Sequence, residues 1–268
     1  MTGRGSDRVS GDLDGPAELL VPRRFQDPVA AYGYQRTVFE QVASGARSLT
    51  ISITPSTRHV GVTRRDTRRP GFEEAVRASN EAGYPVMVRG SGGGATAADE
   101  GTFGFSIVRP AGESEIRRGI NDRYDEAAAL VIGGLSRIGV EAEVGEVRAE
   151  FCPGDHSIRV GSWERGMKLV GIAQRLTRRA TSVGGIVLVH GEEGLASILE
   201  RIYGAMELPF RAGSVGSLRK AGVEAGVDEV IEAFAAEAET RYGARRTAVD
   251  EATLAAARRT GSQHLISR

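Results

Sequence analysis

Arg89-Gly90-Ser91-Gly92-Gly93-Gly94-Ala95 is the stretch that decides the fold, because it lies between two predicted strands, 84–89 and 103–108. Gly90, Gly92 and Ala95 satisfy the spacing of a dinucleotide-binding loop with alanine in the last place. A Rossmann unit needs a helix and then a parallel strand after this loop, a crossover of about a dozen residues or more. Only eight residues separate Gly94 from Phe103. The chain therefore predicts a hairpin-like return, in which the glycines form either a plain tight turn or a nest of backbone amides for an anion or a carbonyl oxygen.

Around this turn the pattern of apolar residues predicts an α+β protein. The clearest helix runs from Ile120 to Ile138, where apolar residues recur at steps of three or four. Further helices are predicted over 28–45, 71–82, 192–203 and 230–242, and further strands over 49–54, 58–65, 140–147, 156–160, 167–176 and 185–190. Residues 1–24 are predicted to be a flexible tail, and residues 207–268 a mostly helical C-terminal extension.

Composition narrows the function classes. The 35 acidic and 35 basic residues balance, so bulk charge favours neither nucleic acid nor a membrane as partner. No stretch has the length and hydrophobicity of a signal peptide or a transmembrane helix. One cysteine excludes an intrachain disulfide framework, and four scattered histidines do not give the spacing of a zinc site. We predict a cytoplasmic protein without a bound metal.

The single cysteine, Cys152, precedes Pro153 and Gly154, and Lys168 follows sixteen residues later. A cation near a thiol favours the thiolate, which is the nucleophilic form. Cys152 and Lys168 are therefore candidate catalytic residues for a reaction through an acyl thioester. The alternative is that Cys152 is a small buried apolar residue with no chemical role.

Two motifs together carry a resemblance to a known family. Residues 89–95, followed by Asp99 and Gly101, are similar to the glycine-rich signature of the lipoate-protein ligase and octanoyltransferase family. Lys168-Leu169-Val170-Gly171-Ile172-Ala173-Gln174 resembles that family's second signature, whose lysine contacts the acyl carbonyl. The resemblance implies a biotin/lipoate protein ligase-like catalytic domain over residues 25–206, with a mixed, largely antiparallel sheet flanked by helices. It implies substrate-binding roles for Arg89, Ser91, Gly92, Gly93, Gly94, Ala95, Gly171, Ala173 and Gln174.

Within the family, Cys152-Pro153-Gly154 is most similar to the cysteine motif of the octanoyltransferases that take the acyl group from glycine-cleavage H protein. This resemblance implies transfer of an octanoyl or lipoyl group through a Cys152 thioester, without a cofactor, to a lysine of a lipoyl domain. The implied partners are the H protein and the lipoyl domains of 2-oxoacid dehydrogenases. Two alternatives stay open: an ATP- and magnesium-dependent lipoate-protein ligase working through lipoyl-AMP, and a relative that binds lipoyl domains without catalysis.

Overall fold

The computed structural model describes residues 16–112, 115 and 117–266. A central eight-stranded mixed sheet has the order β11-β1-β2-β6-β10-β9-β8-β7, and a three-stranded sheet has the order β4-β3-β5. The strands are β1 (Glu18–Leu20), β2 (Thr50–Pro55), β3 (His59–Val62), β4 (Val86–Val88), β5 (Thr96–Ala98), β6 (Thr102–Pro110), β7 (Glu143–Val144), β8 (Ile158–Val160), β9 (Met167–Leu176), β10 (Ala180–Leu188) and β11 (Arg245–Thr247). The prediction of an α+β fold with a mixed, largely antiparallel sheet is confirmed.

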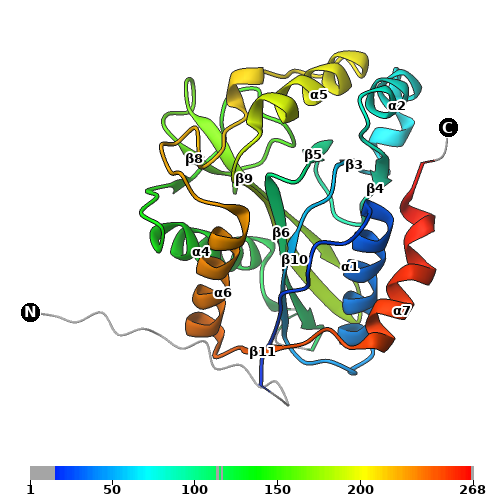
Figure 1. Ribbon diagram of the computed structural model, residues 1–268, viewed down its shortest axis with the longest axis vertical. Helices are drawn as coiled ribbons and strands as arrows, with labels where there is room; N and C mark the ends of the chain where they lie inside the picture. Colours follow the sequence, from blue (N-terminus) through cyan, green and yellow to red (C-terminus); the bar gives the residue numbers. More distant parts are fainter. Residues whose placement is uncertain (1–15, 113–114, 116, 267–268) are drawn as a thin grey trace, which may run out of the picture.

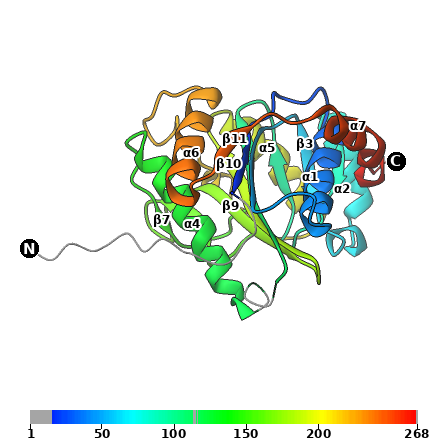
Figure 2. The same cartoon turned by 90° about the horizontal axis from the view of Figure 1, so that it is seen from below.

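Helices cover both faces of the central sheet (Figure 1). They are α1 (Pro28–Ala43), α2 (Phe72–Glu81), α4 (Ile120–Ser136), α5 (Glu192–Ala205), α6 (Val227–Tyr242) and α7 (Glu251–Thr260), with short 3-10 turns at Asp66–Arg68, Ala212–Ser214 and Gly261–His264. Helices α4 and α6 pack together on one face, and α1 and α7 lie on the other (Figure 2). No helix in the described ranges is long and apolar enough to cross a bilayer.

The main core fills the space between the central sheet and helices α4 and α6. Alternate residues of β2 and β6, such as Ile51 and Phe103, point into it, and the ring of Phe234 on α6 meets Phe103 edge to face at 5.1 Å. A second core lies between the small sheet and helices α2 and α5, and it includes Phe151 and Cys152. The glycine-rich turn, the cysteine loop and β9 converge beside the second core, where the Gly94 amide contacts Cys152 and Lys168 contacts the carbonyl of Phe151.

The chain after the glycine-rich turn differs from the predicted hairpin. It continues as β5, which pairs antiparallel with β3, whereas β4 pairs parallel with β3 on the other side. The strands before and after the turn are therefore separated by β3 rather than paired. The return is short, as predicted, but the prediction missed β5 because three residues, Thr96–Ala98, carry too little pattern to mark a strand.

Other boundaries also differ. The predicted strand 140–147 contains only the two-residue β7, and β10 begins at Ala180 rather than 185. Glu18–Leu20, within the predicted tail, form β1, which pairs parallel with both β2 and β11; residues 1–15 of that tail lie outside the described part. At the other terminus the chain returns to the small sheet, where the amide of Ile266 donates to Val86 O at 2.9 Å.

Candidate active site

The thiol of Cys152 lies at the junction of the two sheets, in the loop between β7 and β8. The residue is 8% exposed, and Sγ lies 3.2 Å from both the Gly94 amide nitrogen and Arg89 Nη2, which donate to it. Its φ of 43° is in the left-handed region, which is uncommon for a residue other than glycine. Such strain persists only where surrounding contacts impose it, and it often marks a functional site. These contacts make a purely space-filling role for Cys152 a poor explanation.

The surroundings of Cys152 favour the thiolate. Burial alone would raise the pKa of the thiol, but the charges of Arg89 and Lys168 and the hydrogen bonds from Gly94 and Arg89 oppose it, and the net effect lowers the pKa. A lowered pKa makes the thiolate available at a pH where an ordinary cysteine is mostly protonated. The site therefore favours the nucleophilic form of Cys152 more than the surroundings of an ordinary cysteine do.

We expect the pH profile of Cys152 alkylation to show this directly. The rate with iodoacetamide follows the thiolate fraction, so its midpoint should lie below the value of about 8.5 for a free cysteine. In Arg89→Gln the midpoint should move to higher pH, because a cation and a hydrogen-bond donor to Sγ are removed. Alkylation rates are measured by mass spectrometry from pH 5 to pH 10 in steps of ~0.5 pH unit, and these rates give both midpoints. Identical midpoints in the two proteins would contradict this assignment of Arg89.

The glycine-rich turn needs glycine where it passes the thiol. Gly93 has a φ of 105°, and a Cβ there would lie 2.5 Å from Sγ of Cys152 and 2.7 Å from Arg89 Nη2. Both the backbone conformation and the space therefore exclude a side chain at this position. Arg89 stabilises the turn by donating hydrogen bonds to Gly94 O at 2.6 Å and to Ser91 Oγ at 3.3 Å. In this structure one amide of the turn, that of Gly94, has the sulfur of Cys152 as its acceptor, and a nest for a ligand stays a prediction.

Lys168, on β9, is 1% exposed and has a carboxylate partner that the sequence did not indicate. Its Nζ donates to Glu150 Oε1, Phe151 O and Cys152 O, each at 2.9 Å. These three acceptors engage all three donors of an ammonium group. Lys168 thus holds the cysteine loop in place and adds positive charge beside the thiol. Contact with an acyl carbonyl would require one of these bonds to open.

Tyr203, on α5, joins the cysteine loop to the glycine-rich turn. Its hydroxyl accepts from the Cys152 amide at 2.6 Å and donates to Ala95 O at 2.9 Å. Burial is the main cause that raises its pKa, so it stays a neutral phenol. The sequence showed Tyr203 only as part of the apolar stripe of a helix, which carries no signal for this role.

Replacing Tyr203 with phenylalanine should destabilise the fold by about 1–3 kcal/mol, because it leaves a buried amide and a buried carbonyl without partners. The matched control is Tyr124→Phe, since the ring of Tyr124 stacks on His156 at 4.5 Å and its hydroxyl makes no hydrogen bond with the described residues. Urea unfolding of both variants gives the two free-energy changes. Equal losses in the two would show that the Tyr203 hydroxyl does not join the loops.

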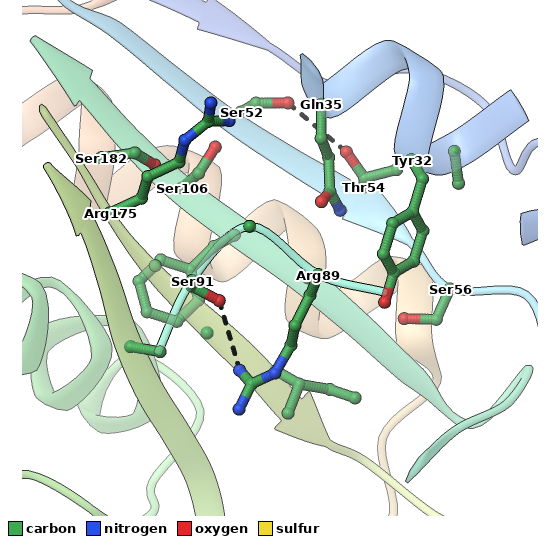
Figure 3. A pocket seen from close by; sticks show the side chains of 18 of the residues that line it. Tyr32, Gln35, Ser52, Thr54, Ser56, Arg89, Ser91, Ser106, Arg175 and Ser182 are labelled. Atoms are coloured by element: carbon green, nitrogen blue, oxygen red, sulfur yellow. Dashed lines mark hydrogen bonds between the residues drawn. The ribbon is translucent and has the colours of Figure 1, made fainter. Parts of the chain in front are cut away.

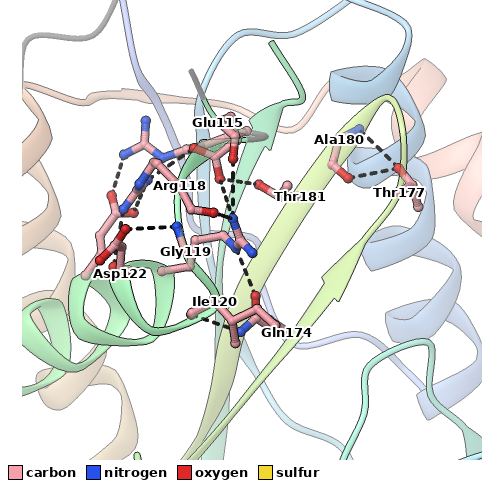
Figure 4. Close-up of polar contacts among 12 residues, drawn as sticks. Glu115, Arg118, Gly119, Ile120, Asp122, Gln174, Thr177, Ala180 and Thr181 are labelled. Carbon is pink, nitrogen blue, oxygen red and sulfur yellow. Dashed lines mark hydrogen bonds and ion pairs between the residues drawn. The ribbon is translucent and has the colours of Figure 1, made fainter. Parts of the chain in front are cut away.

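The structure places the other predicted substrate-binding residues in different surroundings. Ser91, Gly171 and Ala173 line a cavity that opens at Cys152, whereas Gln174 points to the opposite side of the sheet. There its side chain accepts from Arg123 Nε at 2.9 Å and donates to Ile120 O at the start of α4 (Figure 4). Gly92 is exposed and its amide donates to Gln174 O at 3.4 Å, and Ala95 is buried. The hydrogen bond from the Gly92 amide to the Gln174 carbonyl therefore connects the glycine-rich motif to the lysine motif.

The cavity has a volume of about 220 Å³ and lies between α1 and the face of the central sheet that is turned away from the main core (Figure 3). Its lining includes Cys152 and Arg89 at one part and serine and threonine side chains from β2, β6 and β10 at another. His264, from the C-terminal 3-10 turn, also lines it; its Nδ1 lies 2.8 Å from Val88 O. In the described ranges no three His, Cys, Asp or Glu side chains gather to hold a metal.

A buried cysteine whose sulfur accepts hydrogen bonds from a guanidinium and a backbone amide, beside a cavity, is an arrangement typical of enzymes with a cysteine nucleophile. Comparison with known proteins gives the family. Residues 27–239 match the family described as lipoyl protein ligase A/B catalytic domain, and the chain belongs to this family.

Relatives in the family carry transferase names. An octanoyl-[GcvH]:protein N-octanoyltransferase of Geobacillus kaustophilus is 32% identical over 139 residues, 52% of this chain and 47% of that protein. A lipoyl-[GcvH]:protein N-lipoyltransferase of Listeria monocytogenes is 24% identical over 175 residues, 65% of this chain and 61% of that protein. The alignment with the G. kaustophilus protein thus spans about half of its length.

Solved structures share the fold. A lipoate-protein ligase A bound with ATP superposes with a TM-score of 0.70 at 19% identity, covering 93% of this chain and 95% of that one. A bi-partite lipoate protein ligase from Thermoplasma acidophilum gives a TM-score of 0.67 at 18% identity, with 92% of each chain covered. At these identities the similarity establishes the fold only.

Proposed function

We propose that this protein is an acyltransferase of protein lipoylation that moves an octanoyl or lipoyl group through a thioester on Cys152 to a lysine of a lipoyl domain. The observation that carries the proposal is the pair of donors on Sγ: the Gly94 amide and Arg89 Nη2, each at 3.2 Å. An incidental cysteine has no need of a cation and an amide at its sulfur. The transferase names of the relatives support the same reaction.

In the first step the Cys152 thiolate attacks the acyl carbonyl of the donor. A carbon–sulfur bond forms, the bond from the carbonyl carbon to the donor heteroatom breaks, and that heteroatom takes up a proton from solvent. As the sulfur becomes a neutral thioester, Arg89 and the Gly94 amide lose their acceptor and are placed to stabilise the developing oxyanion. Lys168 and Tyr203 act as positioning residues that hold the loop and the turn in register.

In the second step the neutral amine of the acceptor lysine attacks the thioester. The carbon–nitrogen bond forms, the carbon–sulfur bond breaks, and Cys152 returns as a thiolate that its donors again stabilise. The amine proton leaves to solvent. When the donor is an acyl amide on the glycine-cleavage H protein, one amide is exchanged for another, so neither ATP nor magnesium is needed. A lipoyl domain of a 2-oxoacid dehydrogenase is the proposed acceptor.

Transfer from octanoyl H protein to a lipoyl domain, in a reaction without ATP, tests this function. We expect the lipoyl domain to gain one octanoyl mass, in a reaction that EDTA does not affect. Modification of the domain by free lipoate only when ATP and magnesium are added, with release of AMP, would instead identify a ligase. Binding of the lipoyl domain with neither reaction would identify a non-catalytic relative.

A further inference from the structure

Residues 264–266 lie at the edge of the small sheet in the manner of an additional strand. Strand β4 pairs with β3 on one side, and this segment runs antiparallel along its other side (Figure 1). There the Ile266 amide donates to Val86 O at 2.9 Å. Because β4 leads directly into Arg89 and the glycine-rich turn, the segment supports the strand that presents the turn to Cys152.

The peptide group that joins Val88 to Arg89 is bonded on both sides. Its amide donates to Val62 O on β3 at 2.8 Å. Its carbonyl accepts from the imidazole of His264, whose Nδ1 lies 2.8 Å from Val88 O. A carbonyl oxygen can only accept, so Nδ1 carries the hydrogen. Because a peptide group is planar, the two bonds fix the plane from which the Arg89 side chain leaves the backbone.

Arg89 needs this support because the chain that follows it is conformationally free. The three glycines at 92–94 have no side chains, and glycine allows more backbone conformations than any other residue. The turn is held through the Arg89 guanidinium instead, whose Nη2 donates to Gly94 O at 2.6 Å and to Sγ of Cys152 at 3.2 Å. A rotation of the preceding peptide would move the long arginine side chain away from both acceptors.

Helix α1 sets the position of the His264 ring. The ring packs against that of the buried Tyr32, with the two centroids 5.5 Å apart. The 3-10 turn that carries His264 begins at Gly261, where a Cβ would lie 2.0 Å from Val29 O on α1, so only glycine permits this close approach. His264 also lines the cavity that Cys152 lines. Tertiary packing thus brings a side chain from the C-terminal extension to the active site.

We propose that His264 is a positioning residue of the active site, which keeps the Arg89 guanidinium on Sγ of Cys152 by holding the carbonyl of Val88. The inference rests on the proposed function for its effect on acyl transfer. The bond from the guanidinium to sulfur requires a short distance, so a small displacement of Arg89 weakens it. A misplacement of about 1 Å at a reacting group can lower a rate by as much as about 100-fold.

Alkylation of Cys152 tests this without any acyl transfer. We expect His264→Leu to move the midpoint of the pH profile with iodoacetamide to higher pH. The shift should be smaller than that of Arg89→Gln, because the guanidinium is displaced and not removed. The matched control is Gln263→Ala, which should leave the midpoint unchanged, since the Gln263 side chain donates only to Thr260 O within the same turn. An unchanged midpoint in His264→Leu would overturn the proposal.

A conservative variant shows whether the hydrogen bond is the cause. The side-chain N–H of asparagine is the same number of bonds from Cα as Nδ1 of histidine, so His264→Asn can still donate to Val88 O. We expect this variant to recover most of the wild-type midpoint. A midpoint equal to that of His264→Leu would show that the bond to Val88 O is not what holds Arg89.

A double variant separates positioning from a general effect on the fold. If His264 acts through Arg89, adding His264→Leu to Arg89→Gln should move the alkylation midpoint no further. Equal shifts in the two backgrounds would mean that His264 acts independently of Arg89, which would contradict the proposal. In acyl transfer to a lipoyl domain, His264→Leu should lower kcat about tenfold and leave the KM for the domain unchanged.

The two proposals fail separately. If the alkylation midpoints shift as expected but no acyl group passes through Cys152, the proposed function is wrong and the role of His264 in holding Arg89 stands. If transfer occurs but His264→Leu leaves the midpoint unchanged, the role of His264 is wrong and the transferase stands.

Discussion

Replacing Cys152 with alanine should reduce ATP-independent acyl transfer to a lipoyl domain by at least about a thousandfold, because the nucleophile of the proposed first step is lost. In a ligase that uses an adenylate, the thiol takes no part in bond formation, and the same change would have a small effect. The initial rate of octanoyl transfer, followed by the mass of the lipoyl domain, measures the loss.

The fold should survive this substitution. Cys152→Ala removes only the sulfur and keeps the Cys152 amide bond to Tyr203 and the carbonyl bond to Lys168. Binding of the lipoyl domain, measured in the same preparation, serves as the control for folding. A variant that binds the domain normally and keeps more than about a tenth of the transfer rate, a deficit of only ~1.4 kcal/mol, would rule out the thioester route.

The largest effect on stability is expected for Lys168→Met, at about 3–5 kcal/mol. The substitution leaves the Glu150 carboxylate buried at 1% exposure with donors only from Ser157 and the Val147 amide, and it leaves the carbonyls of Phe151 and Cys152 without their shared donor. An uncompensated buried charge is far more costly than the loss of the ion pair itself. Urea unfolding monitored by circular dichroism gives the change in the free energy of unfolding.

Two further variants show whether the unpaired charge of Glu150 causes the loss of stability in Lys168→Met. Lys220→Met removes an exposed lysine that donates to Val215 O, and it should change stability by no more than about 0.5 kcal/mol. Adding Glu150→Leu to Lys168→Met removes the stranded carboxylate and should recover part of the lost stability. If the double variant is less stable than Lys168→Met, the buried charge is not what makes the single change severe.

The sequence predicted most of the fold because long elements carry a pattern. The α4 stripe comes from residues that bury one face, whereas β2 is buried on both faces and its alternation separates the isoleucines of the main core from serine and threonine on the other face. Both elements are confirmed to within a few residues. Strands β1, β5 and β11 have three residues each, too few to show any period. They exist because neighbouring strands accept their backbone bonds, which is information that lies elsewhere in the chain.

The site was predictable where chemistry and local sequence coincide. The glycines, Cys152 and Lys168 lie in recognisable motifs, and the structure brings them together. Glu150 and Tyr203 do not stand out locally, because an isolated glutamate and a tyrosine in an apolar helix face have ordinary explanations. Their importance comes from tertiary packing, which buries the Glu150 carboxylate beside Lys168 and aims the Tyr203 hydroxyl between two loops.

The central claim is that Cys152 carries the acyl group, and trapping that intermediate tests it most directly. Protein incubated with octanoyl or lipoyl H protein, without ATP and without an acceptor domain, is analysed by intact mass. We predict a single acyl adduct that hydroxylamine removes, that peptide mapping places on Cys152, and that Cys152→Ala lacks. No adduct on the wild-type protein, together with AMP release when ATP and lipoate are supplied, would contradict the claim.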